Sequence, residues 1–357
     1  MNNQLLYYDG KRECRLVGGK HKTVVPLLDN SNHEQALEPR RSSPADEADQ
    51  LLEQAIELQK TRQFEAALEL FKQALKIYTE LQHQWGVGRA LRGLGLTMYT
   101  LGDFGQAIEY ANRSLAIAQD VNDQRLEGHV LGILANAYRH LGDLVKAIEQ
   151  GQQSLTIMQQ LQDQPGEVAA LNNLGLAHKA LGDLPSAITY QQQSLKIAQV
   201  LNDRQVQEQI LRNLGNACYA IGDYTQAIEY YQQRRAIARE LGDYRLEGQI
   251  LRNLSNACYA LGDYPQAIEY SRARLLAAQE FGDRRSEEQS LGSLGVAYDA
   301  LGNYAQAIEY YEQRLRVARA IPDKRVEKQA LCSLRVACYA LGDYAKVMEY
   351  DEAGFDA

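Results

Sequence analysis

The sequence predicts an all-α fold in which helical hairpins stack into a solenoid. Three observations predict it: a pattern that recurs every forty residues, two helix-capping signals in each recurrence, and apolar residues at helical spacing between those signals. The repetition is plain in the printed sequence, where LRNLGNACYAIGDYTQAIEYYQQR at 211–234 returns forty residues later as LRNLSNACYALGDYPQAIEYSRAR. Each repeat is therefore expected to contain two helices.

The turn within each hairpin is marked by the tripeptide Leu-Gly-Asp or a close variant. Gly suits the left-handed residue just past a helix, and the Asp or Asn that follows is a good cap for the next helix. These capping residues recur at steps of forty: Asp103, Asp143, Asp183, Asp223, Asp263, Asn303 and Asp343. A second acidic series has the same step and is expected to cap the other helix of each pair: Asp123, Asp163, Asp203, Asp243, Asp283 and Asp323.

The helical array is expected to cover residues 43–352 as about eight helical pairs, with Ser43 as the first N-cap. The first pair is divergent because it lacks the Leu-Gly-Asp turn. The last pair is divergent because Arg335 and Val347 replace small residues of the other repeats. Residues 1–42 show no helical periodicity and are expected to form a disordered tail, and residues 353–357 a short C-terminal tail.

Composition narrows the possible partners. The 357-residue chain is 45% hydrophobic and 24% charged, with a formal net charge of −8. This acidic balance argues against nucleic acid, because phosphates demand clustered Lys and Arg. No apolar run approaches the length that spans a bilayer, and the first residues lack the pattern of a secretion signal. We therefore expect a soluble, cytoplasmic protein that binds neither nucleic acid nor membranes.

The sequence contains no arrangement of side chains typical of catalysis or metal binding. His129 and His140 are eleven residues apart, whereas a zinc-binding helix places two histidines four apart. Cys218, Cys258 and Cys338 share one repeat position with Met, Tyr and His of other repeats, which indicates buried, reduced thiols. We therefore expect no metal, no cofactor and no enzymatic activity.

The repeated positions resemble the tetratricopeptide repeat family. The small, apolar and aromatic positions of that family are matched here by Leu214, Gly215, Cys218, Ala227 and Tyr231. The resemblance implies a right-handed superhelical solenoid whose first helices line a concave groove. It also implies that small residues such as Gly215 let the paired helices approach closely.

Polar side chains are expected on the groove face of two successive first helices. Spacings of three, four and seven residues place on one face of each helix Gln209, Arg212, Asn216 and Tyr219, and then Gln249, Arg252, Asn256 and Tyr259. Asn is unfavourable within a helix, which favours a role for the two asparagines. The position of Tyr219, which is Tyr99 in an earlier repeat and Asp299 in a later one, is expected to face solvent. The alternative to a binding role is that these polar residues form a solvated helix face that was copied when the repeats were duplicated.

A narrower resemblance, to the Pins and LGN polarity adaptors and to long bacterial arrays of the same repeat, rests on the forty-residue period and the tripeptide Leu-Gly-Asn at 214–216. In those adaptors, groove asparagines and an arginine of the second helix grip an extended acidic peptide. The matching residues here are Asn216, Arg234 and Asn256, and Arg274 repeats Arg234. Gln249 stands where those adaptors carry another arginine.

These patterns predict a non-catalytic scaffold or adaptor that binds an extended, acidic peptide or disordered segment of a protein partner in its groove. One alternative is a sensor or regulatory module that serves a separate catalytic effector. Two further alternatives are a hydrolase with its site in the groove and an RNA-binding array. The net charge disfavours RNA.

Overall fold

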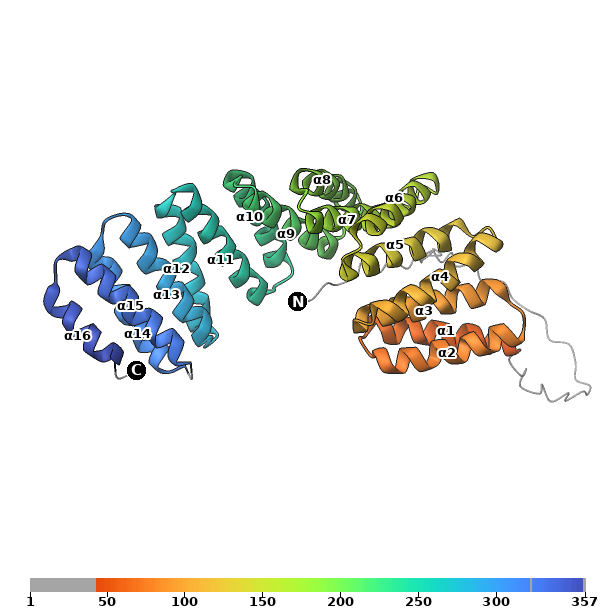
Figure 1. Ribbon diagram of the computed structural model, residues 1–357, viewed down its shortest axis with the longest axis horizontal. Coiled ribbons are helices and arrows are strands. Elements are labelled where there is room, and N and C mark those ends of the chain that lie inside the picture. Colours follow the sequence, from red (N-terminus) through yellow and green to blue (C-terminus); the bar gives the residue numbers. More distant parts are fainter. Residues whose placement is uncertain (1–42, 322, 356–357) are drawn as a thin grey trace, which may run out of the picture. The chain divides into compact units, whose positions relative to one another are not determined.

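The computed structural model of the chain describes residues 43–321 and 323–355, and these residues form sixteen α-helices (Figure 1). The predicted all-α solenoid of helical hairpins is confirmed. The helices are α1 (Pro44–Lys60), α2 (Phe64–Glu80), α3 (Gln84–Leu101), α4 (Phe104–Asp120), α5 (Gln124–Leu141), α6 (Leu144–Gln160), α7 (Gln164–Leu181), α8 (Leu184–Val200), α9 (Arg204–Ala220), α10 (Tyr224–Glu240), α11 (Tyr244–Leu261), α12 (Tyr264–Glu280), α13 (Arg284–Ala300), α14 (Tyr304–Arg319), α15 (Lys324–Leu341) and α16 (Tyr344–Phe355).

The two predicted capping signals are confirmed in every repeat that carries them, whereas α2 of the divergent first repeat has no side-chain cap. The glycine of every Leu-Gly-Asp turn has a positive φ, between 74° at Gly302 and 90° at Gly102. The side chain of Asp103 accepts a hydrogen bond from the backbone N–H of Gln106 over 3.0 Å, and every other member of its series accepts the equivalent bond. The second acidic series also caps the first helices: five members accept from the N–H three residues ahead, and Asp323 accepts from the N–H of Arg325, two residues ahead.

The first described helix begins where the sequence predicts. The Ser43 side chain accepts from the backbone N–H of Asp46, and the Asp46 carboxylate accepts from the backbone N–H of Ser43 over 2.9 Å. This reciprocal pair satisfies two backbone donors at the start of α1. The predicted disordered tail, residues 1–42, lies outside the described residues. At the other end α16 continues to Phe355, past the expected end of the array at 352.

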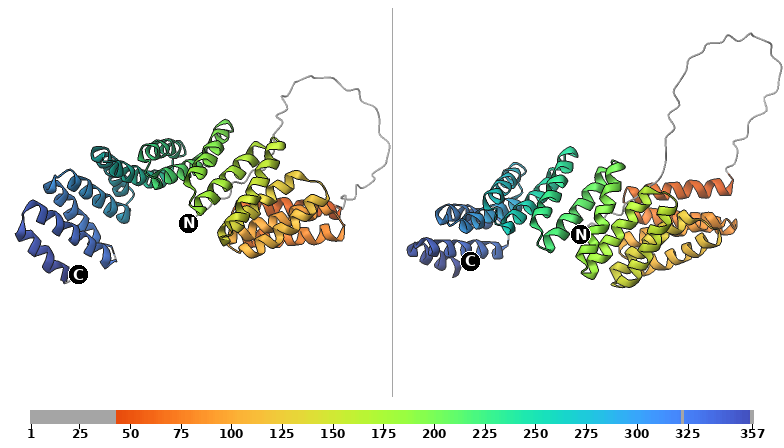
Figure 2. Two further views of the ribbon diagram at one scale, coloured as in Figure 1. Left: turned by 45° about the horizontal axis from the view of Figure 1, so that its top comes forward. Right: turned by 90° about the horizontal axis from the view of Figure 1, so that it is seen from above.

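The helices belong to two compact units. The first, here called unit 1, extends to Ala180, and the second, unit 2, begins at Leu181. Within unit 1, each helix from α1 to α6 packs on the next, and within unit 2 each helix from α8 to α16 does so. Figures 1 and 2 show these neighbours as antiparallel hairpins. The core of unit 2 near its centre includes Tyr231, Leu251 and Cys258, each at most 2% exposed.

Paired small and large residues set how closely the two helices of a repeat approach. A Cβ added to Gly215 would overlap the ring of Tyr231, so only glycine fits there. In the next repeat both partners are small: the hydroxyl groups of Ser255 and Ser271 lie 2.7 Å apart. The predicted role of the small residue is therefore confirmed. In these two repeats its size is matched to that of the residue it faces.

In the last repeat an ion pair takes the place of this small-residue contact. Arg335 replaces the glycine, and its Nη1 lies 2.7 Å from the Oδ1 of Asp351. Both side chains are nearly half exposed, so neither charge is forced into the apolar interior. The divergence at Arg335 is thus a substitution of one helix contact by another.

Candidate functional site

The predicted binding residues all lie in unit 2, on α9 to α12. On α11, Gln249, Arg252 and Asn256 are exposed, and their side chains donate or accept no hydrogen bond within the described residues. Tyr259 is 40% exposed and leans on Tyr264, with ring centroids 5.3 Å apart. The α11 half of the predicted face is therefore open to a ligand.

The α9 half of that face is partly engaged by the protein itself. Asn216 is partly buried, and its Oδ1 accepts a hydrogen bond from the hydroxyl of Tyr231 over 2.8 Å. Tyr219 is 38% exposed and contacts Tyr224 edge to face, with centroids 5.2 Å apart. Asn216 and Asn256 occupy equivalent positions, yet only Asn256 presents its whole amide to solvent.

Arg234 is not a free cation on the surface. Its side chain is 3% exposed, and its Nη2 and Nε lie 2.6 and 2.7 Å from the Oε1 of Glu208 on α9. Burial lowers the pKa of Arg234, and the Glu208 carboxylate opposes that shift. The guanidinium stays charged, because no protein environment deprotonates it. Its charge is neutralised inside the repeat.

The same ion pair recurs two repeats later. Arg314 on α14 donates from Nε to the Oε1 of Glu288 on α13 over 2.6 Å. In both repeats the carboxylate precedes the arginine by 26 residues. In both repeats a glutamate of the first helix holds an arginine of the second, whose side chain is 3% exposed at Arg234 and 14% at Arg314.

Arg274, in the repeat between them, has no such glutamate. The residue 26 positions earlier is Gly248, and an added Cβ there would meet nothing within 4 Å. Arg274 is 6% exposed and donates from Nη2 to the side-chain oxygen of Gln289 over 2.8 Å, while its buried Nε finds no acceptor among the described residues. Burial lowers the pKa of Arg274, and the nearby charge of Arg252 lowers it further.

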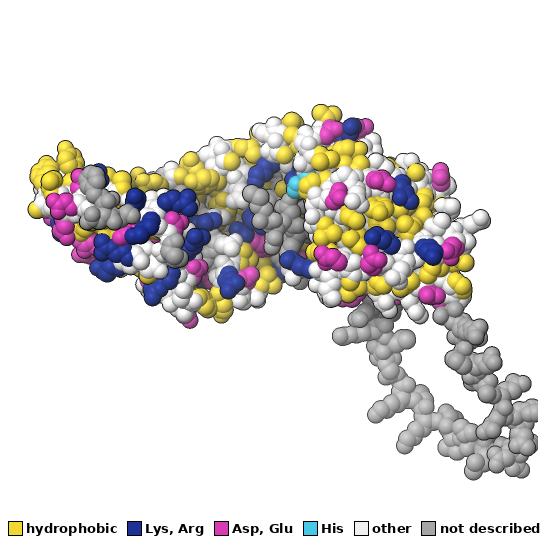
Figure 3. Space-filling model, turned by 60° about the horizontal axis from the view of Figure 1, so that its bottom comes forward, with side chains coloured by type: hydrophobic (Ala, Val, Ile, Leu, Met, Phe, Trp, Pro, Cys, Tyr) yellow, Lys and Arg dark blue, Asp and Glu magenta, His cyan; other side chains and the backbone are white. Residues whose placement is uncertain are grey.

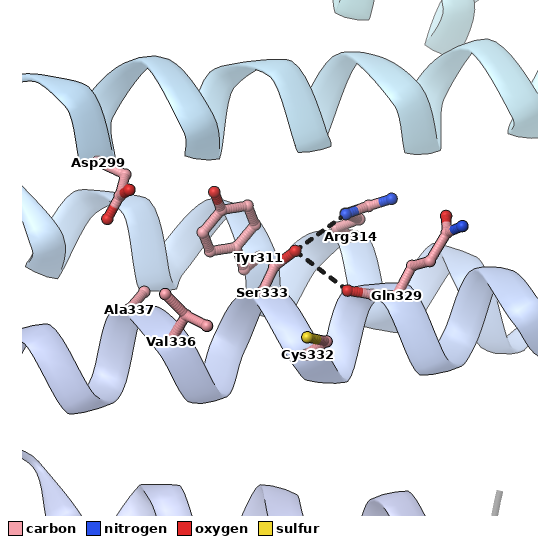
Figure 4. A pocket seen from close by; sticks show the side chains of 8 residues that line it. All are labelled: Asp299, Tyr311, Arg314, Gln329, Cys332, Ser333, Val336 and Ala337. Carbon is pink, nitrogen blue, oxygen red and sulfur yellow. Dashed lines mark hydrogen bonds between the residues drawn. The ribbon is translucent and has the colours of Figure 1, made fainter.

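A hollow lies near the C-terminal end of unit 2, at repeat positions equivalent to those of the predicted binding residues (Figure 4). It has a volume of about 400 Å³, and Figure 4 shows Asp299 above it on α13, Tyr311 and Arg314 behind it on α14, and α15 below. Its lining residues are Asp299, Tyr311, Arg314, Gln329, Cys332, Ser333, Val336 and Ala337. Asp299, Arg314, Gln329, Cys332 and Val336 stand forty or eighty residues after predicted binding residues. The predicted face is therefore hollowed where its side chains are shorter.

One expectation about this face is wrong. The position of Tyr219 was expected to face solvent in every repeat, but Tyr99 is 6% exposed. Its ring lies against Phe104 and His140, and its hydroxyl is 3.0 Å from the Nε2 of His140. Two aromatic neighbours cover this tyrosine in unit 1, whereas Tyr219 and Tyr259 each have one.

Charge is distributed unevenly over the surface. Figure 3 shows Lys and Arg side chains gathered on the part of unit 2 that faces the viewer, although the chain as a whole is acidic. Such a basic area attracts acidic segments more than neutral ones. Within the described residues, no group of three His, Cys, Asp or Glu side chains is placed to hold a metal ion.

The four described cysteines are free thiols, three of them buried and one exposed. Cys218, Cys258 and Cys338 are buried free thiols, as predicted, and burial raises the pKa of Cys218 and Cys258 to about 11. The exposed thiol of Cys332 lines the hollow described above. None of the described helices has the length and apolar character that crossing a bilayer requires.

The sequence interpretation missed Glu208, Glu288 and Gly248. The signal was present, because counting back 26 residues from each of the three arginines reaches Glu, Gly and Glu in turn. Only the packing of α10 on α9 shows that this spacing is a contact.

Family models confirm the class of protein that this fold defines. Models of the tetratricopeptide repeat match residues 58–120, 127–199, 206–275 and 290–325. The chain belongs to the tetratricopeptide repeat family, whose repeats form protein-interaction or regulatory modules and are typically non-catalytic. Comparison with curated protein sequences finds no match.

Solved structures share the fold at low sequence identity. The apo form of RapI superposes with a TM-score of 0.65 and 14% identity, over 85% of each chain. A signal-transduction ATPase of Pyrococcus horikoshii with a tetratricopeptide repeat sensor superposes with a TM-score of 0.61 and 18% identity, over 89% of this chain. This chain spans 54% of that ATPase. The apo quorum sensor NprR of B. thuringiensis superposes with a TM-score of 0.52 and 14% identity, over 87% of each chain.

Proposed function

We propose that the protein is a non-catalytic adaptor that binds an extended, acidic peptide segment of a protein partner on the face formed by α9, α11, α13 and α15 of unit 2. The observation that carries the proposal is the open α11 ladder of Gln249, Arg252 and Asn256. These side chains are exposed, polar and free of internal hydrogen bonds. Asn is suited to pairing with the N–H and C=O groups of an extended backbone, and Arg to carboxylates.

Three further features support this assignment. The exposed tyrosines, Tyr219 and Tyr259, recur at the same step and offer flat apolar surface beside the polar ladder. The hollow against α15 continues the same repeat positions. The gathered Lys and Arg side chains of unit 2 favour an acidic partner over a neutral one.

The proposal is tested with peptides displayed from a random library. We expect the wild type to select sequences enriched in Asp and Glu. The selected peptides should lose most of their affinity for the triple variant Gln249→Ala, Asn256→Ala, Tyr259→Ala. The matched control is Thr225→Ala, Glu229→Ala, Gln233→Ala, which removes three exposed side chains from the outer face of α10. Selection without acidic enrichment, or equal loss in both variants, would overturn the proposal.

A second candidate function is a sensor or regulatory module that acts on a separate catalytic effector. It is favoured by the fold shared with an ATPase that carries a tetratricopeptide repeat sensor and with a quorum sensor. Affinity purification tests it: one predominant enzyme, recovered with the wild type and lost with the α11 triple variant, would favour this candidate over a general adaptor.

A further inference from the structure

The three equivalent arginines of unit 2 differ in one respect that concerns binding. Arg234 and Arg314 each donate to a glutamate of their own repeat over 2.6 to 2.7 Å. Arg274 is as well buried as these, at 6% exposure, but its hydrogen-bond acceptors are neutral: Gln289 over 2.8 Å and Ser286 over 3.4 Å. One buried positive charge in the middle of the face is therefore left without a carboxylate in contact.

Neighbouring carboxylates do not fill this role. Glu288 is held by Arg314 over 2.6 Å. Asp283 accepts the backbone N–H of Ser286 over 3.0 Å as the N-cap of α13. On α11, the charge of Arg252 repels that of Arg274. A buried arginine with only neutral acceptors and a second cation beside it is strongly biased toward an anion.

The space for such an anion lies where the glutamate stands in the other two repeats. Gly248 has no side chain, and the position of its absent Cβ is open, with nothing within 4 Å. The buried Nε of Arg274 lacks an acceptor, whereas the Nε of Arg234 and the Nε of Arg314 each reach a glutamate. Gly248 is therefore open at the repeat position from which Glu208 and Glu288 reach their arginines, while Arg274 donates to neutral side chains of α13 instead.

We propose that Arg274, Arg252 and the open position at Gly248 form a carboxylate-binding subsite, which takes an Asp or Glu side chain of the bound peptide in place of the missing internal glutamate. This inference rests on the proposed function and sharpens it, because it names the acidic residue of the partner as the anchor. It also assigns different roles to equivalent residues: Arg274 binds the partner, whereas Arg234 and Arg314 hold their own repeats together.

The subsite is tested with a variant of the protein that carries the missing carboxylate on α11 itself. Gly248→Glu places a glutamate 26 residues before Arg274, as in the repeats of Arg234 and Arg314, and is expected to occupy the guanidinium. Gly248→Ala is the control for binding, because its Cβ meets nothing within 4 Å and leaves the position open. Gly248→Gln, with the same size and helix propensity as Glu but no charge, is the control for stability. The probes are the rhodamine-labelled peptides acetyl-SESESE-amide and acetyl-SQSQSQ-amide, followed by fluorescence anisotropy.

We expect the wild type and Gly248→Ala to bind the Glu peptide about tenfold more tightly than the Gln peptide, as one charge-assisted hydrogen bond implies. Gly248→Glu should abolish that preference. It should also melt at a higher temperature than Gly248→Gln, because only the glutamate pairs with Arg274. The subsite is overturned if the wild type binds both peptides equally, or if Gly248→Glu keeps the preference.

The two failures are distinguishable. If Gly248→Glu keeps the Glu preference while the α11 triple variant still loses its selected peptides, the subsite is wrong and the adaptor face stands. If the α11 triple variant binds its selected peptides as well as the wild type does, the adaptor face itself is wrong.

Discussion

The hydroxyl of Tyr231 donates a hydrogen bond to the Oδ1 of Asn216 over 2.8 Å. This bond joins a residue of the proposed binding face to a core residue that is 2% exposed. Asn216 is thus part of the packing between α9 and α10 as well as of the surface.

Removing either partner of this bond is expected to lower stability. Asn216→Ala and Tyr231→Phe should each reduce the free energy of unfolding by about 1 kcal/mol, the usual value of one intramolecular hydrogen bond. Asn256→Ala is the control, since that amide makes no internal hydrogen bond and its loss should leave stability unchanged. Urea unfolding measures all three. Equal effects of Asn216→Ala and Asn256→Ala would show that the bond does not contribute.

Overpacking at the glycine of the central repeat is expected to be costly. Gly215→Leu forces a side chain into the ring of Tyr231, with an expected loss of about 1–3 kcal/mol or more. Arg335→Leu removes only a half-exposed ion pair and should cost about 1 kcal/mol at most. Denaturant midpoints compare the two variants, and a larger shift for Arg335→Leu would contradict the assigned packing.

The buried arginines are expected to differ in their contribution to stability. Arg234→Met leaves the Glu208 carboxylate without its partner at a partly buried site and should cost about 2–3 kcal/mol. Arg274→Met leaves no carboxylate stranded and should cost less than half as much. Arg234→Glu is unsuitable as a binding probe, because it would set two carboxylates against each other. If the two Met variants melt at the same temperature, the ion pair of Arg234 with Glu208 does not contribute as described.

Stability is expected to depend on the protonation of His129. Burial lowers its pKa from 6.5 to about 4, and the charge of Arg92 acts in the same direction. As the pH falls below about 6.5, the unfolded chain binds this proton before the folded one does, so folding is disfavoured. The contribution is therefore complete above pH 7 and is lost between about pH 6.5 and 4. It amounts to at most about 3 kcal/mol.

His129→Gln should flatten this part of the stability profile, which urea unfolding at several pH values would reveal. The control is His140→Gln. Burial and the charge of Arg139 also lower the pKa of His140, but this histidine lies partly exposed at the end of α5. An unchanged slope in His129→Gln would exclude His129 as the titrating group.

Residues 1–40 are expected to be dispensable for folding. The capping box of Ser43 and Asp46 satisfies two backbone donors at the start of α1. A protein that begins at Arg41 should keep its helical circular dichroism and a cooperative thermal transition, whereas one that begins at Ala45 loses the cap and should melt lower by an amount corresponding to about 1 kcal/mol. Loss of cooperativity in the longer protein would show that the N-terminal residues contribute to the core.

The sequence by itself determined the repeat length, the helix ends and the family. These depend on local interactions: a glycine such as Gly102 adopts positive φ, and an aspartate such as Asp103 caps the backbone three residues ahead. Such signals act within one or two turns of helix, so they are readable without knowing what packs against them. The polar face of α9 and α11 was also predictable, because helical spacing alone puts its residues together.

Only the tertiary structure decided which of these face residues are free. Asn216 and Asn256 stand at the same repeat position, but Tyr231 reaches the first, while Ser271, the residue at its position in the next repeat, is bonded to Ser255 instead. Arg234 and Arg274 are likewise equivalent, and a glutamate on the neighbouring helix neutralises only one of them. Whether each side chain is free or bonded depends on residues far away in sequence that packing brings within hydrogen-bonding distance. The repeat pattern does not predict those partners, because they differ from one repeat to the next.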